Sequence, residues 1–289
     1  MELIILQFFE KIRCGFLTAI SFASSLFGET LFLILLICLI YWLYDKKLGE
    51  RLVVTSFTSM TINGALKCIV ARPRPYVKGG VTRLEIDNPL LSTMDLQPYE
   101  SFPSGHSQMG AGLFFSGAFF YNKKWGWILF PILTVCVMLS RLYFGVHYPT
   151  DVLFGASLGI LFAWFWDFIY KKTENKKYYI LISFAALSVF FIYLFPGNKT
   201  VWEMSACTVA TTLCLPLENK YIDFQNATSW KNRGWRALVG FICVGVVYGL
   251  FSFLPFAFLE KYVWKFVKYF LVVVTGALLV PYLFKKLKI

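Results

Sequence analysis

The stretch PSGHSQMGAGLFFSGAFFY, residues 103–121, joins a short polar start to a long run that carries no charged residue. A helix needs about 20 apolar residues to cross a hydrocarbon core that is about 30 Å thick. The run therefore predicts a membrane-embedded helix over residues 106–121. It places His106, one of only two histidines in the chain, at the edge of that helix.

The composition of the whole chain agrees with a membrane protein. Of its 289 residues, 58% are hydrophobic and 15% are charged, whereas a soluble domain carries about 25% charged residues. The apolar runs do not alternate with polar residues, which excludes a β-barrel. The predicted fold class is all-α, a polytopic membrane helix bundle of about nine spans. The other expected spans lie near residues 27–44, 52–70, 126–144, 151–170, 178–195, 200–217, 237–256 and 263–284.

The N-terminal segment and the basic residues determine the expected topology. Glu10, Lys11 and Arg13 interrupt residues 2–25, so we expect an amphipathic helix in the membrane interface, with a full span as the alternative. By the positive-inside rule, the side that collects most lysines and arginines is cytoplasmic. The net charge of +12 then reflects topology and anionic lipid headgroups, and no nucleic-acid partner is expected. The basic residues of that side lie within 46–51, 123–124, 171–177, 220–236 and 285–288.

The opposite side collects residues that are suited to chemistry. Three segments far apart in the chain carry them, and both histidines are among them. Each segment begins or ends at an expected span, so all three are predicted to meet at one membrane face. The segments are CIVARPRP (68–75), which follows Lys67 and contains Arg74; PSGH (103–106); and SRLYFGVHYPTD (140–151), which contains Arg141, His147 and Asp151.

Each of these residues also has an ordinary structural explanation. A lysine at a span end extends to the headgroups, which would explain Lys67. Ser104 and Gly105 are residues that favour a helix start, and His147 and Asp151 can satisfy each other as a hydrogen-bonded pair. Three unrelated segments that place complementary groups on one face nevertheless favour a functional site.

The chemistry that fits these groups is phosphoryl transfer. Lys67, Arg74 and Arg141 can neutralise the oxygens of a phosphate where water is partly excluded. The helix start at Ser104 and Gly105 adds amide donors, and glycine allows the backbone to approach an anion closely.

The two histidines are expected to divide the work. A carboxylate on one ring nitrogen of His147, supplied by Asp151, would leave the other nitrogen as a nucleophile. His106 is suited to protonate the departing alkoxide and later to activate water. Two histidines and few carboxylates make a poor binuclear metal site, so we expect neither a metal nor another cofactor.

The three-part pattern resembles the signature of the type 2 phosphatidic acid phosphatase (PAP2) superfamily. That superfamily includes lipid phosphate phosphatases, glucose-6-phosphatase and vanadium haloperoxidases. The resemblance covers about residues 50–170 and implies a six-helix core. It implies that His147 is the phosphorylated nucleophile, His106 the general acid and Asp151 the orienting carboxylate. It also implies phosphate ligands at Lys67, Arg74, Ser104, Gly105 and Arg141.

Residues 173–289 lie outside that pattern. We expect residues 1–172 to form the PAP2-like catalytic core, and residues 173–289 to form a C-terminal transmembrane extension of about four helices. The extension is expected to pack around the core or to form a homodimer surface, with a lateral groove for a lipid chain as the functional alternative. Within the core, Gly155 and Gly159 have the spacing that allows two helices to approach closely.

A site at headgroup depth favours an amphiphilic substrate. The predicted function is a lipid phosphate phosphatase that acts on prenyl diphosphate, phosphatidate, phosphatidylglycerol phosphate or a similar lipid. The alternatives are a phosphatase for small soluble phosphates, a vanadium haloperoxidase and a transporter. The expected location is a bacterial inner membrane, with the site on its exoplasmic face. Acids in the loop before PSGH are expected to be solvated or to select headgroups: Glu85, Asp87, Asp95 and Glu100.

Overall fold

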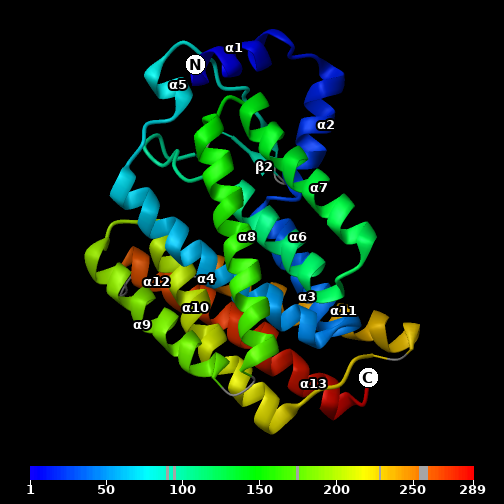
Figure 1. Ribbon diagram of the computed structural model, residues 1–289. Coiled ribbons are helices and arrows are strands. Elements are labelled where there is room, and N and C mark those ends of the chain that lie inside the picture. The colour runs from blue at the N-terminus through cyan, green and yellow to red at the C-terminus, as the bar shows by residue number, and fades with distance from the viewer. Residues whose placement is uncertain (89–90, 94–95, 174–175, 228, 254–259) are drawn as a thin grey trace. The chain divides into compact units, whose positions relative to one another are not determined.

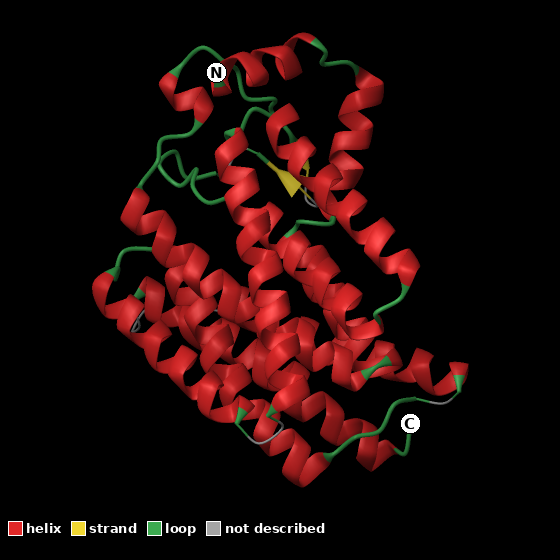
Figure 2. Ribbon diagram, in the orientation of Figure 1, coloured by secondary structure: helices red, strands yellow, loops and turns green. Residues whose placement is uncertain are grey.

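The computed structural model consists almost entirely of helices and describes residues 1–88, 91–93, 96–173, 176–227, 229–253 and 260–289 (Figures 1 and 2). Its contacts divide the chain into two compact units. The first unit contains Met1–Leu35 and Ile62–Phe168, and the second contains Leu36–Thr61 and Ile169–Ile289. An N-terminal piece of chain thus belongs with the C-terminal residues. The domain boundary expected at residue 172 stays a prediction.

The first unit contains the segments singled out above. Its core includes, in the described part of the chain, a group of apolar side chains around Leu142 and Val152 and another around Phe144 and Val146. Because both groups flank the turn between two long helices, that turn and His147 within it are held in place. The helices are α1 (Glu2–Lys11), α2 (Gly15–Leu26), part of α3 (Thr30–Leu39), part of α4 (Lys46–Val70), α5 (Pro75–Lys78), α6 (Gly105–Tyr121), α7 (Lys124–Tyr143) and most of α8 (Pro149–Lys172); the antiparallel strands β1 (Asp87–Asn88) and β2 (Leu91–Ser92) complete it.

The N-terminal segment differs from the expected single helix over residues 2–25. It forms two helices, because the chain leaves helical geometry between Lys11 and Gly15. Arg13 lies in this break, where its guanidinium donates to the carbonyl oxygens of Thr82 (2.8 Å) and Tyr143 (3.2 Å). Two charge-assisted hydrogen bonds to the loop and to α7 compensate for the interrupted helix. The position of this segment relative to the membrane stays a prediction.

The predicted close approach of helices at Gly155 and Gly159 is confirmed. A Cβ atom added to Gly155 would lie 2.5 Å from the Ser104 carbonyl oxygen. One added to Gly159 would overlap the carbonyl oxygen of Gln108 on α6. Because the side chain of glycine is a single hydrogen atom, the first half of α8 can lie against the start of α6.

The second unit packs around aromatic side chains. Trp42 is almost fully buried against Phe284 and donates from its indole nitrogen to the carbonyl oxygen of Gly276 at 2.9 Å. This contact fixes an N-terminal segment against the C-terminal helices of the same unit. Besides its part of α4, the unit contains the π-helical segment η1 (Ile40–Tyr44), α9 (Lys177–Leu194), α10 (Lys199–Leu217), η2 (Glu218–Ile222), α11 (Trp230–Phe253), α12 (Lys261–Val274), η3 (Thr275–Leu279) and α13 (Val280–Leu287).

The predicted all-α, multi-pass membrane architecture is confirmed. In the described residues, 6 helical segments are long and apolar enough to cross a membrane. The expected spans near 27–44, 106–121 and 200–217 overlap α3 with η1, α6 and α10, which are also helical. Residues 254–256 of another expected span lie outside the described residues. The count of nine spans stays a prediction. The six segments are Lys46–Lys78, Lys124–Tyr143, Pro149–Lys172, Lys177–Leu194, Trp230–Phe253 and Lys261–Leu287.

We predict that Gly159→Ala destabilises the protein because its methyl group meets fixed backbone atoms of α6. Overpacking of this kind costs about 1–3 kcal/mol of unfolding free energy, so the apparent melting temperature in detergent should fall. Gly249→Ala on α11 is the matched control, because nothing lies within 4 Å of the added Cβ atom. Equal melting temperatures for the two variants would contradict the close approach.

Candidate active site

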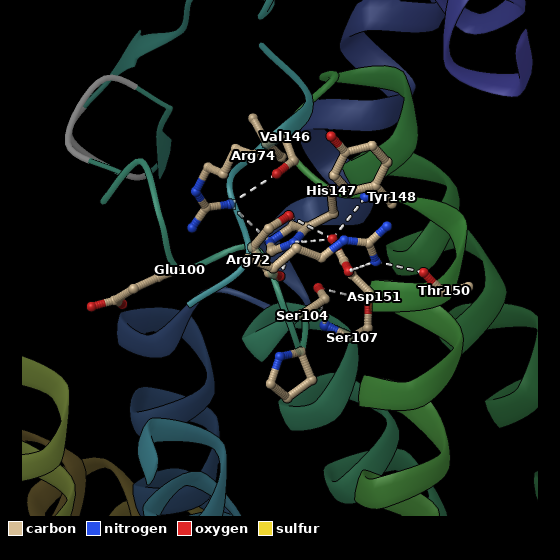
Figure 3. A network of polar contacts seen from close by, with 12 residues as sticks. Arg72, Arg74, Glu100, Ser104, Ser107, Val146, His147, Tyr148, Thr150 and Asp151 are labelled. Atoms are coloured by element: carbon tan, nitrogen blue, oxygen red, sulfur yellow. Dashed lines mark hydrogen bonds and ion pairs between the residues drawn. The ribbon is translucent and has the colours of Figure 1, made fainter. Parts of the chain in front are cut away.

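His147 lies in the turn between α7 and α8 and is 2% exposed (Figure 3). Its Nδ1 atom is 2.7 Å from the carbonyl oxygen of Ser101. A carbonyl oxygen only accepts hydrogen bonds, so Nδ1 carries the proton and Nε2 keeps the lone pair. Asp151, the expected partner of this nitrogen, lies farther away, with its Oδ2 atom 3.6 Å from Nδ1. The nearer partner of the imidazole is therefore a backbone carbonyl.

Asp151 is fully buried and holds the surroundings of His147 together. Its Oδ2 atom accepts from the Ser101 hydroxyl at 2.5 Å and from the Tyr148 backbone amide at 2.8 Å. The bond to Tyr148 spans the first turn of α8, where a carboxylate at the third helical position satisfies the amide at the helix start. Asp151 thus fixes both the turn that carries His147 and the residue that bonds its ring.

Arg72 supplies the cation that Asp151 needs. Its Nη1 atom donates to Oδ1 of Asp151 at 2.6 Å, and its Nη2 atom donates to Oε2 of Glu2 at 2.7 Å. The guanidinium also lies over the ring of Tyr148, 4.0 Å from the centroid. A buried carboxylate without such a partner would be costly. Arg72 stands inside the segment 68–75, in which only Arg74 was predicted to be a site residue.

Arg74 faces the other ring nitrogen of His147 (Figure 3). It is 2% exposed, and its Nη1 atom lies 3.2 Å from Nε2 of His147 and 2.9 Å from the carbonyl oxygen of Val146. A guanidinium has only donors, so Arg74 donates to the Nε2 lone pair. Burial, and then the charge of Arg74, hold the pKa of His147 well below its ordinary value. The imidazole is therefore neutral at neutral pH.

Two further cations lie near this pair. Arg141 is fully buried, and its Nη1 atom donates to the Ser25 hydroxyl at 2.6 Å. Its Nε and Nη2 atoms have no hydrogen-bond partner in the described part of the chain. Lys67 acts electrostatically on both Arg74 and Arg141, while its Nζ atom lies 3.8 Å from Glu100. Unsatisfied donors on a buried cation can hold an anion.

The PSGH segment is joined to the same network. The Ser104 amide donates to the Asp151 carbonyl oxygen at 3.0 Å, and the Ser104 hydroxyl accepts from the Ser107 amide at 3.4 Å. The hydroxyl therefore caps α6, which agrees with the structural explanation given above for Ser104 as a residue that favours a helix start. Gly105 and His106 form the first turn of α6.

His106 has a partner that sequence analysis missed. Its Nε2 atom lies 2.7 Å from Oε2 of Glu29, which directly precedes α3. A signal was present in the sequence, because Glu29 is the only charged residue between Arg13 and Asp45. A lone acid in such an apolar segment needs a partner.

The structure brings all predicted site residues into the first unit. Arg141 acts electrostatically on both imidazoles, and Lys67 acts on His106 and on Asp151. The described residues contain no group of three or more His, Cys, Asp or Glu side chains that could hold a metal ion. The roles assigned to these residues stay predictions. The residues are Lys67, Arg74, Ser104, Gly105, His106, Arg141, His147 and Asp151.

Among the loop acids, Glu100 contacts the site through Lys67. Glu85 is 68% exposed and lies 3.6 Å from Arg83. Asp87 belongs to β1, and Asp95 lies outside the described residues. Selection of headgroups by these acids stays a prediction.

Comparison with known families and proteins places this site in context. The PAP2 superfamily profile matches residues 50–175. A second profile, described as the transmembrane extension of PAP2 superfamily phosphatases, matches residues 202–289. The first match contains the three segments of the site, and the second falls within the C-terminal residues.

Curated relatives give the same assignment. Phosphatidylglycerophosphatase B of Bacillus subtilis is 32% identical over 178 residues, which cover 57% of this chain and 79% of the relative. The bacitracin transport permease protein BcrC of Bacillus licheniformis is 32% identical, with coverage of 44% and 59%. An undecaprenyl-diphosphatase of Sulfolobus acidocaldarius is 32% identical, with coverage of 39% and 51%. The chain thus spans only about half the length of two of these relatives. With the three-part site, the two profile matches and these relatives, the chain belongs to the PAP2 superfamily.

Proposed function

We propose that the protein is a membrane phosphatase that hydrolyses a phosphomonoester or diphosphate of an amphiphile through a phosphohistidine at His147. The observation that carries this proposal is the state of the His147 ring. Its Nδ1 proton is committed to the Ser101 carbonyl oxygen, and its Nε2 lone pair faces the Arg74 guanidinium. A neutral, oriented imidazole beside a cation is suited to attack a bound phosphoryl group.

The cations would hold the phosphoryl group for this attack. Arg74 would move its hydrogen bond from Nε2 to a phosphoryl oxygen, which frees the lone pair. Arg141 would satisfy its two unpaired nitrogen atoms on the same anion, and Lys67 would add a third positive charge. Charge that develops on the phosphoryl oxygens in the transition state is stabilised by such fixed cations.

His106 would complete the reaction as the proton donor. In the first step Nε2 of His147 attacks phosphorus, the bond to the leaving oxygen breaks, and His106 protonates that oxygen. In the second step His106 takes a proton from water, which attacks phosphorus and releases Nε2 of His147. Asp151, held by Arg72, would keep the Ser101 carbonyl in place while the ring gains charge. No step in this scheme requires a metal ion.

The proposed substrate is a lipid phosphate. The support is that the site residues lie at ends of membrane helices, and that relatives are described as a phosphatidylglycerophosphatase and an undecaprenyl-diphosphatase. Prenyl diphosphate, phosphatidate and phosphatidylglycerol phosphate are the leading candidates. By the positive-inside rule the site would face the exoplasmic side of a bacterial inner membrane.

We expect phosphate release by the purified, detergent-solubilised protein in the presence of EDTA. The substrates to test are prenyl diphosphate, phosphatidate, phosphatidylglycerol phosphate, sphingosine phosphate and glucose 6-phosphate. His147→Ala should lower the rate by a factor on the order of 10³ or more, because the nucleophile is lost. An equal rate on glucose 6-phosphate would favour a soluble-phosphate enzyme, and unchanged activity in His147→Ala would refute the mechanism.

The nucleophile can be identified directly by rapid acid-free quenching with a ³²P-labelled substrate. Wild-type protein should carry a label that survives alkali and is lost in acid, as expected for phosphohistidine. With labelled 4-nitrophenyl phosphate, whose leaving group needs no proton, His106→Ala should accumulate the label because the water step loses its base, whereas His147→Ala should carry none. A label retained by folded His147→Ala would assign the nucleophile to another residue.

The protonation state of the His147 ring predicts how this residue titrates. Because the chain has only two histidines, imidazole NMR signals can be assigned by single substitutions. His147 should remain a neutral Nδ1–H tautomer through pH 6, since its pKa is lowered. Arg74→Gln should raise that pKa by removing the adjacent positive charge, while the exposed Lys78→Gln should leave it unchanged.

The same pKa predicts how stability depends on pH. Below about pH 6.5 the unfolded state binds a proton on this histidine that the folded state excludes. Acidification through this range should therefore lower the free energy of unfolding, and less so in Arg74→Gln. A His147 signal that titrates at its ordinary pKa would contradict the assigned geometry.

A further inference from the structure

Glu29 is an acid in the apolar N-terminal region, and no role was predicted for it. It is the only charged residue in residues 14–44. Its side chain is 25% exposed, and its Oε2 atom lies 2.7 Å from Nε2 of His106. An ionisable residue in an apolar segment is energetically costly. A carboxylate that bonds one imidazole there therefore indicates a function at that imidazole.

The backbone aims this carboxylate. Gly28 donates to the Ser25 carbonyl oxygen at 2.9 Å, and Glu29 donates to the Leu26 carbonyl oxygen at 3.0 Å, so a tight turn ends α2. A Cβ atom added to Gly28 would lie 2.9 Å from both Cβ and the carbonyl oxygen of His106. The turn therefore rests directly on the first turn of α6, and the position of Glu29 is set by packing.

The same turn also contacts Arg141, a cation that acts on His106. Ser25, at the start of the turn, accepts from Nη1 of Arg141 at 2.6 Å. The charged groups that act on His106 include Glu29, Arg141 and Lys67. Burial and the two cations oppose protonation of the imidazole, and Glu29 is the one acid among these three groups. A proton on His106 therefore depends on Glu29.

The hydrogen bond also decides which nitrogen exchanges protons. A carboxylate accepts from Nε2–H, so Nδ1 is the remaining donor of a protonated ring. Nδ1 of His106 has no hydrogen-bond partner among the residues that the structure describes. It is thus the nitrogen that remains available to bond a ligand.

We propose that Glu29 is a positioning residue that holds His106 by Nε2 and favours protonation of the ring once an anionic phosphate occupies the site, so that Nδ1–H serves the leaving oxygen. This inference rests on the proposed function. When the phosphorus–oxygen bond breaks, its electron pair stays with the leaving oxygen, which takes the Nδ1 proton, and His106 becomes neutral. In the water step Nδ1 takes a proton back. Glu29 remains a carboxylate throughout.

The test separates proton donation from structure by the choice of leaving group. The substrates are dodecyl phosphate, whose alkoxide needs a proton to leave, and 4-nitrophenyl phosphate, whose phenolate does not. The rate of phosphoenzyme formation is measured in single turnovers for wild type, Glu29→Gln, Glu29→Asp and Glu260→Gln. Glu260 is the control because it is an exposed acid outside the first unit.

We expect Glu29→Gln to slow phosphorylation by dodecyl phosphate about 10²-fold, within the usual range for general acid catalysis. The rate with 4-nitrophenyl phosphate should change by less than about 3-fold for the same reason. The alkaline limb of the pH profile with dodecyl phosphate should move to lower pH. Glu29→Asp should recover part of the rate, and Glu260→Gln should match wild type.

Each other outcome would overturn the inference. Equal losses on both substrates would mean that Glu29 only shapes the site, and unchanged rates on both would mean that His106 works without it. A wild-type protein that forms no phosphoenzyme would instead refute the proposed function itself. Thermal unfolding of each variant in detergent distinguishes loss of the proton donor from loss of the fold.

Discussion

The buried carboxylate of Asp151 is the constraint on which the site depends. It accepts hydrogen bonds from Ser101, Tyr148 and Arg72, which belong to three separate stretches of chain. In a region of low dielectric constant, a carboxylate must be paired and fully hydrogen-bonded, and breaking such a pair costs about 3–5 kcal/mol. The chain therefore gathers around Asp151, and His147 is oriented as a consequence.

The second constraint is an excess of buried positive charge. Arg74 and Arg141 are almost completely removed from solvent, yet Arg141 leaves two nitrogen atoms unpaired in the described structure. Two nearby cations repel each other, and this repulsion is relieved when an anion with several oxygens binds between them. Burial and the charge of Arg74 lower the pKa of His147 and keep it neutral. The site thus combines buried cations with an unprotonated imidazole.

The predicted site residues and their partners differ in how they could be found. Lys67, His106 and His147 stood out because ionisable groups at the ends of apolar spans are costly. Ser101 could not be found in this way, since it acts through a backbone carbonyl that every residue possesses. Arg72 was missed beside Arg74, because its role depends on a tertiary contact with Asp151. Glu29 carried a signal, but its partner lies 77 residues away.

The sequence by itself determined the membrane class, the helical architecture and the three segments of the site, because these depend on apolar run length and on residue type. Helix packing at Gly155 and Gly159 could also be predicted, since their spacing is a local property. Tertiary structure alone decided the pairing of Glu29 with His106 and the break at Arg13. Such contacts join distant parts of the chain, and their free energy depends on which groups packing brings within hydrogen-bond distance.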